Sequence, residues 1–157
     1  MLREYYDDLS DCIVKYYGEI YQYVGDEIVV TWTLRRGSHN NNCIQCFFAM
    51  KTAIRKQAIK YNEKFGLLPE FKAGFHFGKV TTGEIGKIKK EIIFTGDVLN
   101  TTARIQSLCN AYKVDILISD KLMKELNLDS SFQIKTLGEN ELRGKDERIG
   151  LFTIRMF

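Results

Sequence analysis

The sequence lacks the features that divide a chain or place it in a membrane. Its 157 residues include a single proline, Pro69, and no internal repeat, low-complexity tract or glycine/serine-rich linker. No apolar run approaches the roughly 18 residues of a membrane span, and the amino-terminal stretch MLREYYDDLSD is too acidic for a secretory signal. We therefore expect one domain over residues 1–157 in the cytoplasm, without membrane contact from this segment and with room for regulatory or membrane domains upstream.

The sequence is also short of cysteine and of charge of one sign. A formal net charge of +3 is too small to indicate a nucleic-acid partner. The 4 cysteines fall in helical patterns, which in a reducing compartment predicts free thiols rather than disulfides. With 45% hydrophobic and 27% charged residues the composition is that of an ordinary globular protein, so its partners have to be inferred from individual sites.

What the sequence does contain is a mixture of helix-type and strand-type patterns. Apolar residues at helical spacing predict helices over residues 2–17, 41–65, 98–112 and 121–127. Strand-type runs cover residues 19–24 and 27–33, a pair formed by 71–78 and 79–86, a short strand at 91–94, a buried strand at 115–119, and a final pair at 131–138 and 148–155. This order predicts an α+β layered domain of ferredoxin-like type, with helices packed on a mostly antiparallel sheet.

Three separated segments carry side chains suited to chemistry. The stretch YVGDEIVV, residues 23–30, places Asp26 at the tip of a tight hairpin. Asn100 and Arg104 stand 4 residues apart in a predicted helix, so an amide and a guanidinium project from one face. A late Leu-Arg-Gly-Lys segment ends at Lys145. An isolated Gly-Asp pair indicates only a turn, so the interpretation depends on the three segments together.

The order of these segments resembles the class III nucleotidyl cyclases, the adenylate and guanylate cyclase catalytic domain family. The similarity covers nearly the whole chain: the Gly-Asp hairpin, a long helix, G-x-H-x-G-x-V-x-x-G-x-x-G at residues 74–86, G-D-x-x-N-x-x-A-R at residues 96–104, a buried I-L-I-S strand and the L-R-G-K ending. The resemblance implies an enzyme that converts a nucleoside triphosphate, ATP or GTP, into a 3′,5′-cyclic nucleotide and pyrophosphate for intracellular signalling.

The resemblance also implies roles for individual residues. Asn100 is expected to hold the ribose, Arg104 to stabilise negative charge on the α-phosphate, and Lys145 to contact the β- and γ-phosphates. Asp26 matches the family's second metal-binding aspartate, a ligand in a site for two Mg²⁺ or Mn²⁺ ions. The family works as a head-to-tail homodimer, which implies that Asp26 of one chain faces Asn100 and Arg104 of the other.

Two parts of the family pattern differ in this sequence. The family's first metal aspartate lies in a motif F-x-D-x-x-x-S-T on the strand before the first helix, and this chain begins inside that helix, so we expect the fold without its N-terminal strand. The positions that read the base, commonly lysine or glutamate with aspartate or threonine, are Gln22 and Ile93. An amide both donates and accepts, so Gln22 suits either purine or a pyrimidine. The alternative to an enzyme is a catalytically silent, cyclase-like module for dimerisation or nucleotide sensing.

Overall fold

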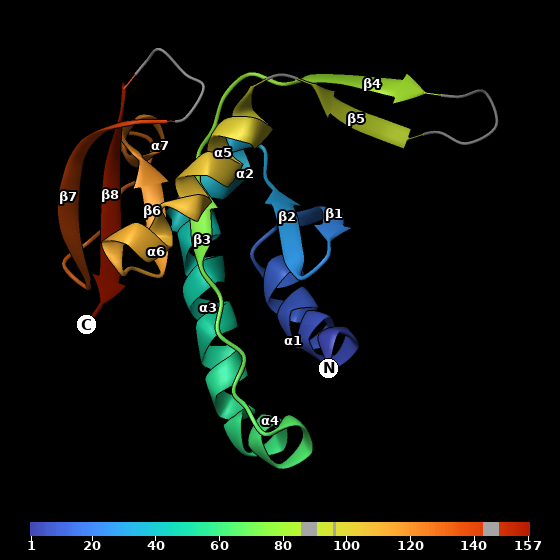
Figure 1. Ribbon diagram of the computed structural model, residues 1–157. Helices are drawn as coiled ribbons and strands as arrows, with labels where there is room; N and C mark the ends of the chain where they lie inside the picture. Colours follow the sequence, from blue (N-terminus) through green and yellow to red (C-terminus); the bar gives the residue numbers. More distant parts are fainter. Residues whose placement is uncertain (86–90, 96, 143–147) are drawn as a thin grey trace. The chain divides into compact units, whose positions relative to one another are not determined.

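The computed structural model (Figure 1) describes residues 1–85, 91–95, 97–142 and 148–157, and for 81–85 and 91–95 it describes the backbone alone. The elements are α1 (Leu2–Lys15), β1 (Glu19–Val24), β2 (Glu27–Thr31), α2 (Leu34–Ser38), the 3₁₀ turn η1 (His39–Asn41), α3 (Asn42–Lys56), α4 (Ala58–Phe65), β3 (Ala73–Phe75), β4 (Thr81–Ile85), β5 (Glu91–Thr95), α5 (Val98–Ser107), α6 (Cys109–Tyr112), β6 (Ile116–Ser119), α7 (Asp120–Met123), β7 (Phe132–Glu141) and β8 (Arg148–Met156). Helices and strands mixed in this way confirm the predicted α+β class. Within the described residues, no helix is both long enough and apolar enough to span a bilayer.

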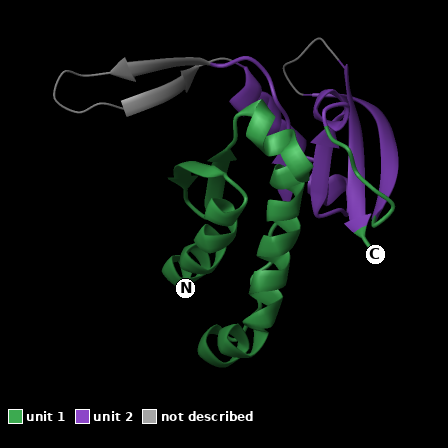
Figure 2. Cartoon of the chain, turned by 180° about the vertical axis from the view of Figure 1, so that it is seen from behind, with its two compact units in different colours: residues 1–71, 126–131, 156 green, residues 72–125, 132–155, 157 purple. Residues whose placement is uncertain are grey.

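Two compact units make up the chain (Figure 2). Unit 1 contains residues 1–71, 126–131 and 156, and unit 2 contains residues 72–125, 132–155 and 157. The organisation as one catalytic domain over residues 1–157 stays a prediction.

In unit 1 the core forms where α1 meets α3. Buried apolar side chains recur at helical spacing on both helices: Tyr5, Leu9 and Ile13 on α1, and Cys46, Met50 and Ile54 on α3. Partly buried residues of the β1–β2 hairpin pack on the same cluster. Since Leu9 is only 1% exposed, its truncation to alanine should cost about 2–5 kcal/mol. The core therefore fixes α1 as a rigid support beside the hairpin.

The predicted helix over residues 41–65 is wrong as a single element, because the chain bends at Gln57 between α3 and α4. Gln57 has φ −98° and ψ 13°, and no proline or glycine marks the bend in the sequence. The second half instead turns towards α1, where Asp8 accepts hydrogen bonds from Lys60 Nζ at 2.9 Å and from the Tyr61 hydroxyl. A tertiary contact decides the bend, so the helical periodicity of the sequence does not reveal it.

The sequence patterns did not predict the short helix α2. Helix α2 follows β2, and Thr33 at its N-cap accepts a hydrogen bond from the Arg36 backbone N–H at 3.3 Å. A threonine at this position is a recognised helix-start signal, but a helix of 5 residues is too short to show a periodic apolar pattern.

In unit 2 a four-stranded sheet has the order β3-β6-β8-β7. Strands β3 and β6 are parallel, and β6 and β8 are antiparallel. The predicted pairing of 71–78 with 79–86 is therefore wrong, since β3 pairs with β6 while β4 pairs with β5 in a separate antiparallel sheet. Parallel neighbours need a crossover segment, and here helix α5 lies in the stretch between β3 and β6. The parallel pair therefore joins strands that are far apart in the sequence.

Helix α5 lies close against β3 because Gly74 has no side chain. A Cβ added to Gly74 would lie 2.6 Å from the backbone nitrogen of Gln106 and 2.9 Å from its Cα. Further along, Ile105 and Cys109 are buried with Leu117 and Leu151 of the sheet. The position of α5, which carries two of the predicted site residues, is thus set by a close contact between helix and strand backbones.

Candidate functional site

Asp26 lies on the two-residue turn between β1 and β2, in unit 1. Val24 pairs with Glu27, so Gly25 and Asp26 form the loop. Gly25 has φ +60°, whereas the φ angle of Asp26 is not positive. A positive φ at the first central residue alone corresponds to a type II′ turn, which favours glycine there and matches the twist of the strands. The turn leaves the Asp26 carboxylate exposed at the tip of the hairpin.

Helix α1 contacts this turn through one side chain. The hydroxyl of Tyr6 donates a hydrogen bond to the carbonyl oxygen of Gly25 at 2.6 Å. The Tyr6 ring also lies against the Tyr23 ring, with 4.6 Å between centroids. Partial burial raises the pKa of Tyr6, and the negative charge of Asp26 raises it further. The phenol therefore stays protonated and able to donate at neutral pH.

Gln22 is directed by a bulge in β1. Ile20 pairs with Val30 and Gln22 pairs with Val29, which leaves Tyr21 as an extra residue. Directly paired residues share a face, and Ile20 and Val30 pack against the core beside α1, so Gln22 and Val29 share the other face. In a strand without a bulge, Gln22 would lie on the same face as Ile20. The bulge thus turns Gln22, an exposed residue, away from α1.

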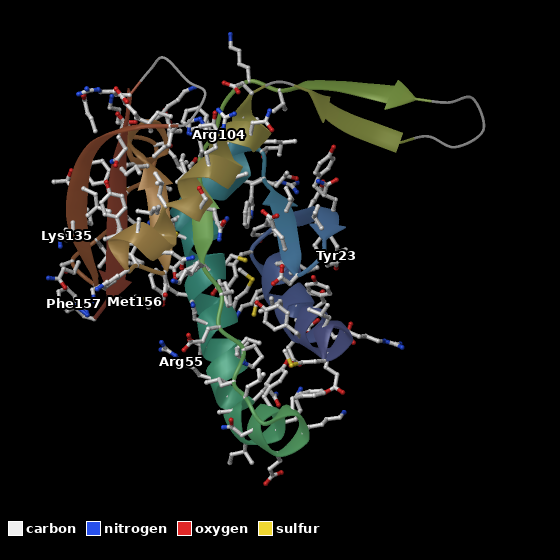
Figure 3. The ribbon with its side chains drawn as sticks, in the orientation of Figure 1. Tyr23, Arg55, Arg104, Lys135, Met156 and Phe157 are labelled. Atoms are coloured by element: carbon white, nitrogen blue, oxygen red, sulfur yellow. The ribbon has the colours of Figure 1, made fainter. Side chains whose placement is uncertain are left out.

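Asn100 and Arg104 both lie on α5, in unit 2. Figure 3 shows Arg104 projecting from this helix. Asn100 is exposed and Arg104 is half-buried, while the adjacent positions Thr101 and Ile105 are 1% and 0% exposed. The buried pair holds one side of the helix, so the spacing of 4 residues leaves an amide and a guanidinium one turn apart on a neighbouring side.

Two predicted residues lie outside what the structure describes. Lys145 is not among the described residues, and Ile93 is described only through its backbone, which pairs with Gly83 in the β4–β5 sheet. The remaining four divide between the units: Gln22 and Asp26 belong to unit 1, whereas Asn100 and Arg104 belong to unit 2. The roles assigned to all six residues stay predictions.

A divalent ion at this site would need several oxygen ligands. Asp26 fits as one ligand, because it is an exposed carboxylate on a fixed turn and Mg²⁺ and Mn²⁺ prefer oxygen donors. Across the described ranges, however, no group of three or more histidine, cysteine, aspartate or glutamate side chains is suitably placed to hold a metal. Asp26 can therefore contribute to a metal site but does not form one with its described neighbours.

His76 has a structural contact at the end of β3. Its Nδ1 lies 2.8 Å from the Ser119 Oγ at the end of β6, and the same Oγ accepts a hydrogen bond from the Leu122 N–H at the start of α7. The contact joins the ends of two parallel strands and gives His76 a structural hydrogen-bond partner just after β3. Neither Tyr6 nor Ser119 was singled out from the sequence, because a tyrosine in an apolar helix pattern and a serine after a strand carry no distinctive spacing.

The known proteins that are similar to this chain include nucleotidyl cyclases. The family model for the adenylate and guanylate cyclase catalytic domain matches residues 1–155. Adenylate cyclase 2 of Rhizobium meliloti is 32% identical over 146 residues, which are 93% of this chain and 40% of that protein. The chain thus spans less than half of the length of this relative.

Solved structures give the same result for the fold. A bacterial light-regulated adenylyl cyclase superposes with a TM-score of 0.80 at 18% identity, covering 98% of this chain and 43% of that one. A guanylyl cyclase superposes with a TM-score of 0.76 at 22% identity, covering 98% of this chain and 77% of that one. These matches confirm the predicted fold type.

Proposed function

Because the chain belongs to the adenylate and guanylate cyclase catalytic domain family, we propose that it catalyses formation of a 3′,5′-cyclic nucleotide from a nucleoside triphosphate. In this reaction the ribose 3′-oxygen forms a bond to the α-phosphorus and gives up its proton. The bond from the α-phosphorus to the bridging oxygen of the β-phosphate breaks, and pyrophosphate leaves with the electron pair. The observation that carries the proposal is the pair Asn100 and Arg104, presented one turn apart on α5 in a chain of this family.

The two side chains suit the two ends of the reacting group. The Asn100 amide can donate to and accept from the ribose, which orients the attacking hydroxyl. Arg104 offers a planar fork of donors to the phosphate oxygens as negative charge redistributes during bond exchange. Side chains one helical turn apart are separated by about 6 Å at Cβ, a distance comparable to that between a ribose and its α-phosphate. Lys145, expected near the β- and γ-phosphates, would add a point charge for the leaving pyrophosphate.

Members of this family use divalent metal ions, and we assign Asp26 as one ligand. A bound Mg²⁺ or Mn²⁺ would neutralise the triphosphate and favour deprotonation of the 3′-hydroxyl. The task of the protein at this position is to hold one carboxylate in a fixed place, which the type II′ turn favours. Further oxygen donors would come from the nucleotide, from water or from residues outside the described set.

A head-to-tail homodimer would combine the two halves of the site. Gln22 and Asp26 lie on one hairpin of unit 1, and Asn100 and Arg104 lie on one helix of unit 2. In a two-fold dimer each chain can supply the hairpin to one site and the helix to the other, which gives two equivalent sites. Gln22, exposed on the face away from α1, would then meet the base together with position 93. Because an amide can pair with adenine or guanine, ATP and GTP remain the two leading substrates.

Mass spectrometry of the products tests the proposal. The full-length protein that carries this chain is incubated with each of the four nucleoside triphosphates and with Mg²⁺ or Mn²⁺, and cyclic product is measured. We expect a cyclic purine nucleotide, and we expect its formation to be lost in Asn100→Ala. If the folded protein binds nucleotide with metal but forms no cyclic product from any of the four, the silent nucleotide-sensing module replaces the enzyme.

A further inference from the structure

The hydroxyl of Tyr6 reaches the turn that carries Asp26 from outside the hairpin. Its bond to the Gly25 carbonyl oxygen is 2.6 Å long and connects residues 19 positions apart. The Tyr23 ring lies 4.6 Å from the Tyr6 ring between centroids, with 48° between the ring planes. One residue of α1 thus contacts the turn at its backbone and β1 at an aromatic side chain. Both contacts lie within unit 1.

The helix that carries Tyr6 is itself held firmly. Its inner face is buried in the core of unit 1 through Leu9 and Ile13, each 1% exposed. Beside this face, α1 is also tied to α4, because Asp8 accepts hydrogen bonds from Lys60 and Tyr61. A side chain on such a helix has a fixed origin, so the Tyr6 hydroxyl can act as a stationary donor for the turn.

The pairing of Val24 with Glu27 closes the turn, and its tip is exposed to solvent. Gly25 is exposed, and a Cβ placed on it would have no heavy atom within 4 Å. The Tyr6 hydroxyl donates a side-chain hydrogen bond to the backbone of this turn, at the Gly25 carbonyl oxygen. A glycine in a tight turn has more conformational freedom to lose than any other residue, so one external hydrogen bond restricts the turn considerably.

We propose that Tyr6 is a positioning residue for Asp26: its bond to the Gly25 carbonyl holds the turn in the conformation that presents the carboxylate to the metal. This inference rests on the proposed role of Asp26 as a metal ligand. Tyr6 does not touch metal or nucleotide, and it acts through the backbone of the residue before Asp26. The orientation of the turn, and not only the presence of a carboxylate, then contributes to metal affinity.

The substitution Tyr6→Phe removes the hydroxyl and keeps the ring. Tyr23→Phe is the matched control, because it removes a hydroxyl from the other ring of the same pair. Among the described residues, the hydrogen bond to the Gly25 carbonyl oxygen comes from Tyr6 and not from Tyr23. Both variants and Asp26→Ala are made in the full-length protein and checked for an unchanged thermal midpoint. Hydrogen exchange of the Glu27 amide, which belongs to the pair that closes the turn, is measured without metal, and Mn²⁺ affinity is measured by water-proton relaxation without nucleotide.

We expect Tyr6→Phe to speed exchange of the Glu27 amide about fivefold, the effect of losing one ordinary hydrogen bond. The Mn²⁺ dissociation constant should rise by a similar factor, and saturating Mn²⁺ should restore turnover, which a general loss of folded protein would not allow. Tyr23→Phe should change neither quantity.

The outcomes separate the two proposals. If Asp26→Ala loses Mn²⁺ binding while Tyr6→Phe retains the parental exchange rate or the parental affinity, the positioning role of Tyr6 is wrong and the role of Asp26 stands. If Asp26→Ala binds Mn²⁺ as the parent does, the metal role of Asp26 is wrong, and the inference about Tyr6 is overturned with it.

Discussion

Replacing Gly74 with alanine should destabilise unit 2 by forcing β3 and α5 apart. The added Cβ would lie 2.6 Å from the backbone nitrogen of Gln106 and 2.9 Å from both its Cα and its Cβ. Two of these three atoms belong to the helix backbone and cannot swing away as the end of a side chain can. Overpacking of this kind costs about 1–3 kcal/mol, and for a chain of this size each kcal/mol lowers Tm by about 2–4 °C.

Gly78 supplies the control for the same substitution. A Cβ at Gly78 would meet Val98 at 3.5 Å, an ordinary contact, so Gly78→Ala should change the free energy of unfolding by no more than about 0.5 kcal/mol. Urea unfolding followed by circular dichroism measures both variants. Because α5 carries Asn100 and Arg104, Gly74→Ala should also lower turnover through displacement of these side chains. Equal unfolding midpoints for Gly74→Ala and Gly78→Ala would refute the conclusion that the glycine sets the distance between helix and strand.

Three further outcomes are expected. Arg104→Ala should lower kcat/KM by about 10²-fold, on the order of 3 kcal/mol of transition-state stabilisation. The control Arg55→Ala, which removes an exposed arginine from α3, should leave kcat/KM unchanged. Similar kinetics in the two variants would make Arg104 an ordinary surface arginine. Mixing Asp26→Ala with Arg104→Ala should restore part of the activity, because a mixed dimer collects both substitutions in one site and leaves the other intact, and no recovery despite demonstrated subunit exchange would place each site within one chain. Burial, with smaller contributions from Tyr6 and Asp26, raises the pKa of Tyr5 to about 12. The stabilisation from the protonated phenol is therefore complete below the unfolded pKa of about 10 and is lost as the pH rises through about 12. Tyr5→Phe should flatten this alkaline decline of the free energy of unfolding in chemical denaturation, and an unchanged slope would contradict the assignment.

The parts of the fold that sequence pattern predicts well are those decided by neighbouring residues. The hairpin at Gly25 and Asp26 forms where predicted, because a glycine with positive φ and two flanking apolar runs are local features. Helix α4 likewise ends at Gly66, which has φ +73° and ends the helix as a C-terminal glycine commonly does. By contrast, the bend at Gln57 depends on the contact of Tyr61 with Asp8, two residues far apart in the chain.

The pairing of β3 shows the same limit on a larger scale. Residues 71–78 and 79–86 are adjacent in sequence and both have strand character, so a hairpin is the simplest prediction from local pattern. The actual partner, β6, is separated from β3 in the sequence by α5, which packs on Gly74. Neither the close approach at one glycine nor the parallel register leaves a periodic signal in the sequence.

The candidate site divides in a similar way. Asp26, Asn100 and Arg104 could be named from motif order, since each belongs to a spaced pattern of the family. Tyr6 could not, because its contribution depends on one hydroxyl meeting one carbonyl oxygen across 19 residues. Residues that touch a substrate tend to leave a pattern, whereas residues that hold them in place are visible mainly in three dimensions.

The bulge in β1 makes position 22 tolerant of substitution. The bulge at Tyr21 separates a stretch whose alternation is fixed by the core, at Ile20, from a stretch that presents Gln22 on the opposite face. Exposed substitutions away from the core usually change stability by no more than about 0.5 kcal/mol. Other side chains can therefore be placed at position 22 with little effect on the packing of α1, so the proposed contact of Gln22 with the base can be tested by substitution without disturbing the core. Loss of the bulge with Tyr21 retained would have the opposite effect, since regular alternation would move Gln22 to the face of Ile20, which packs on the core.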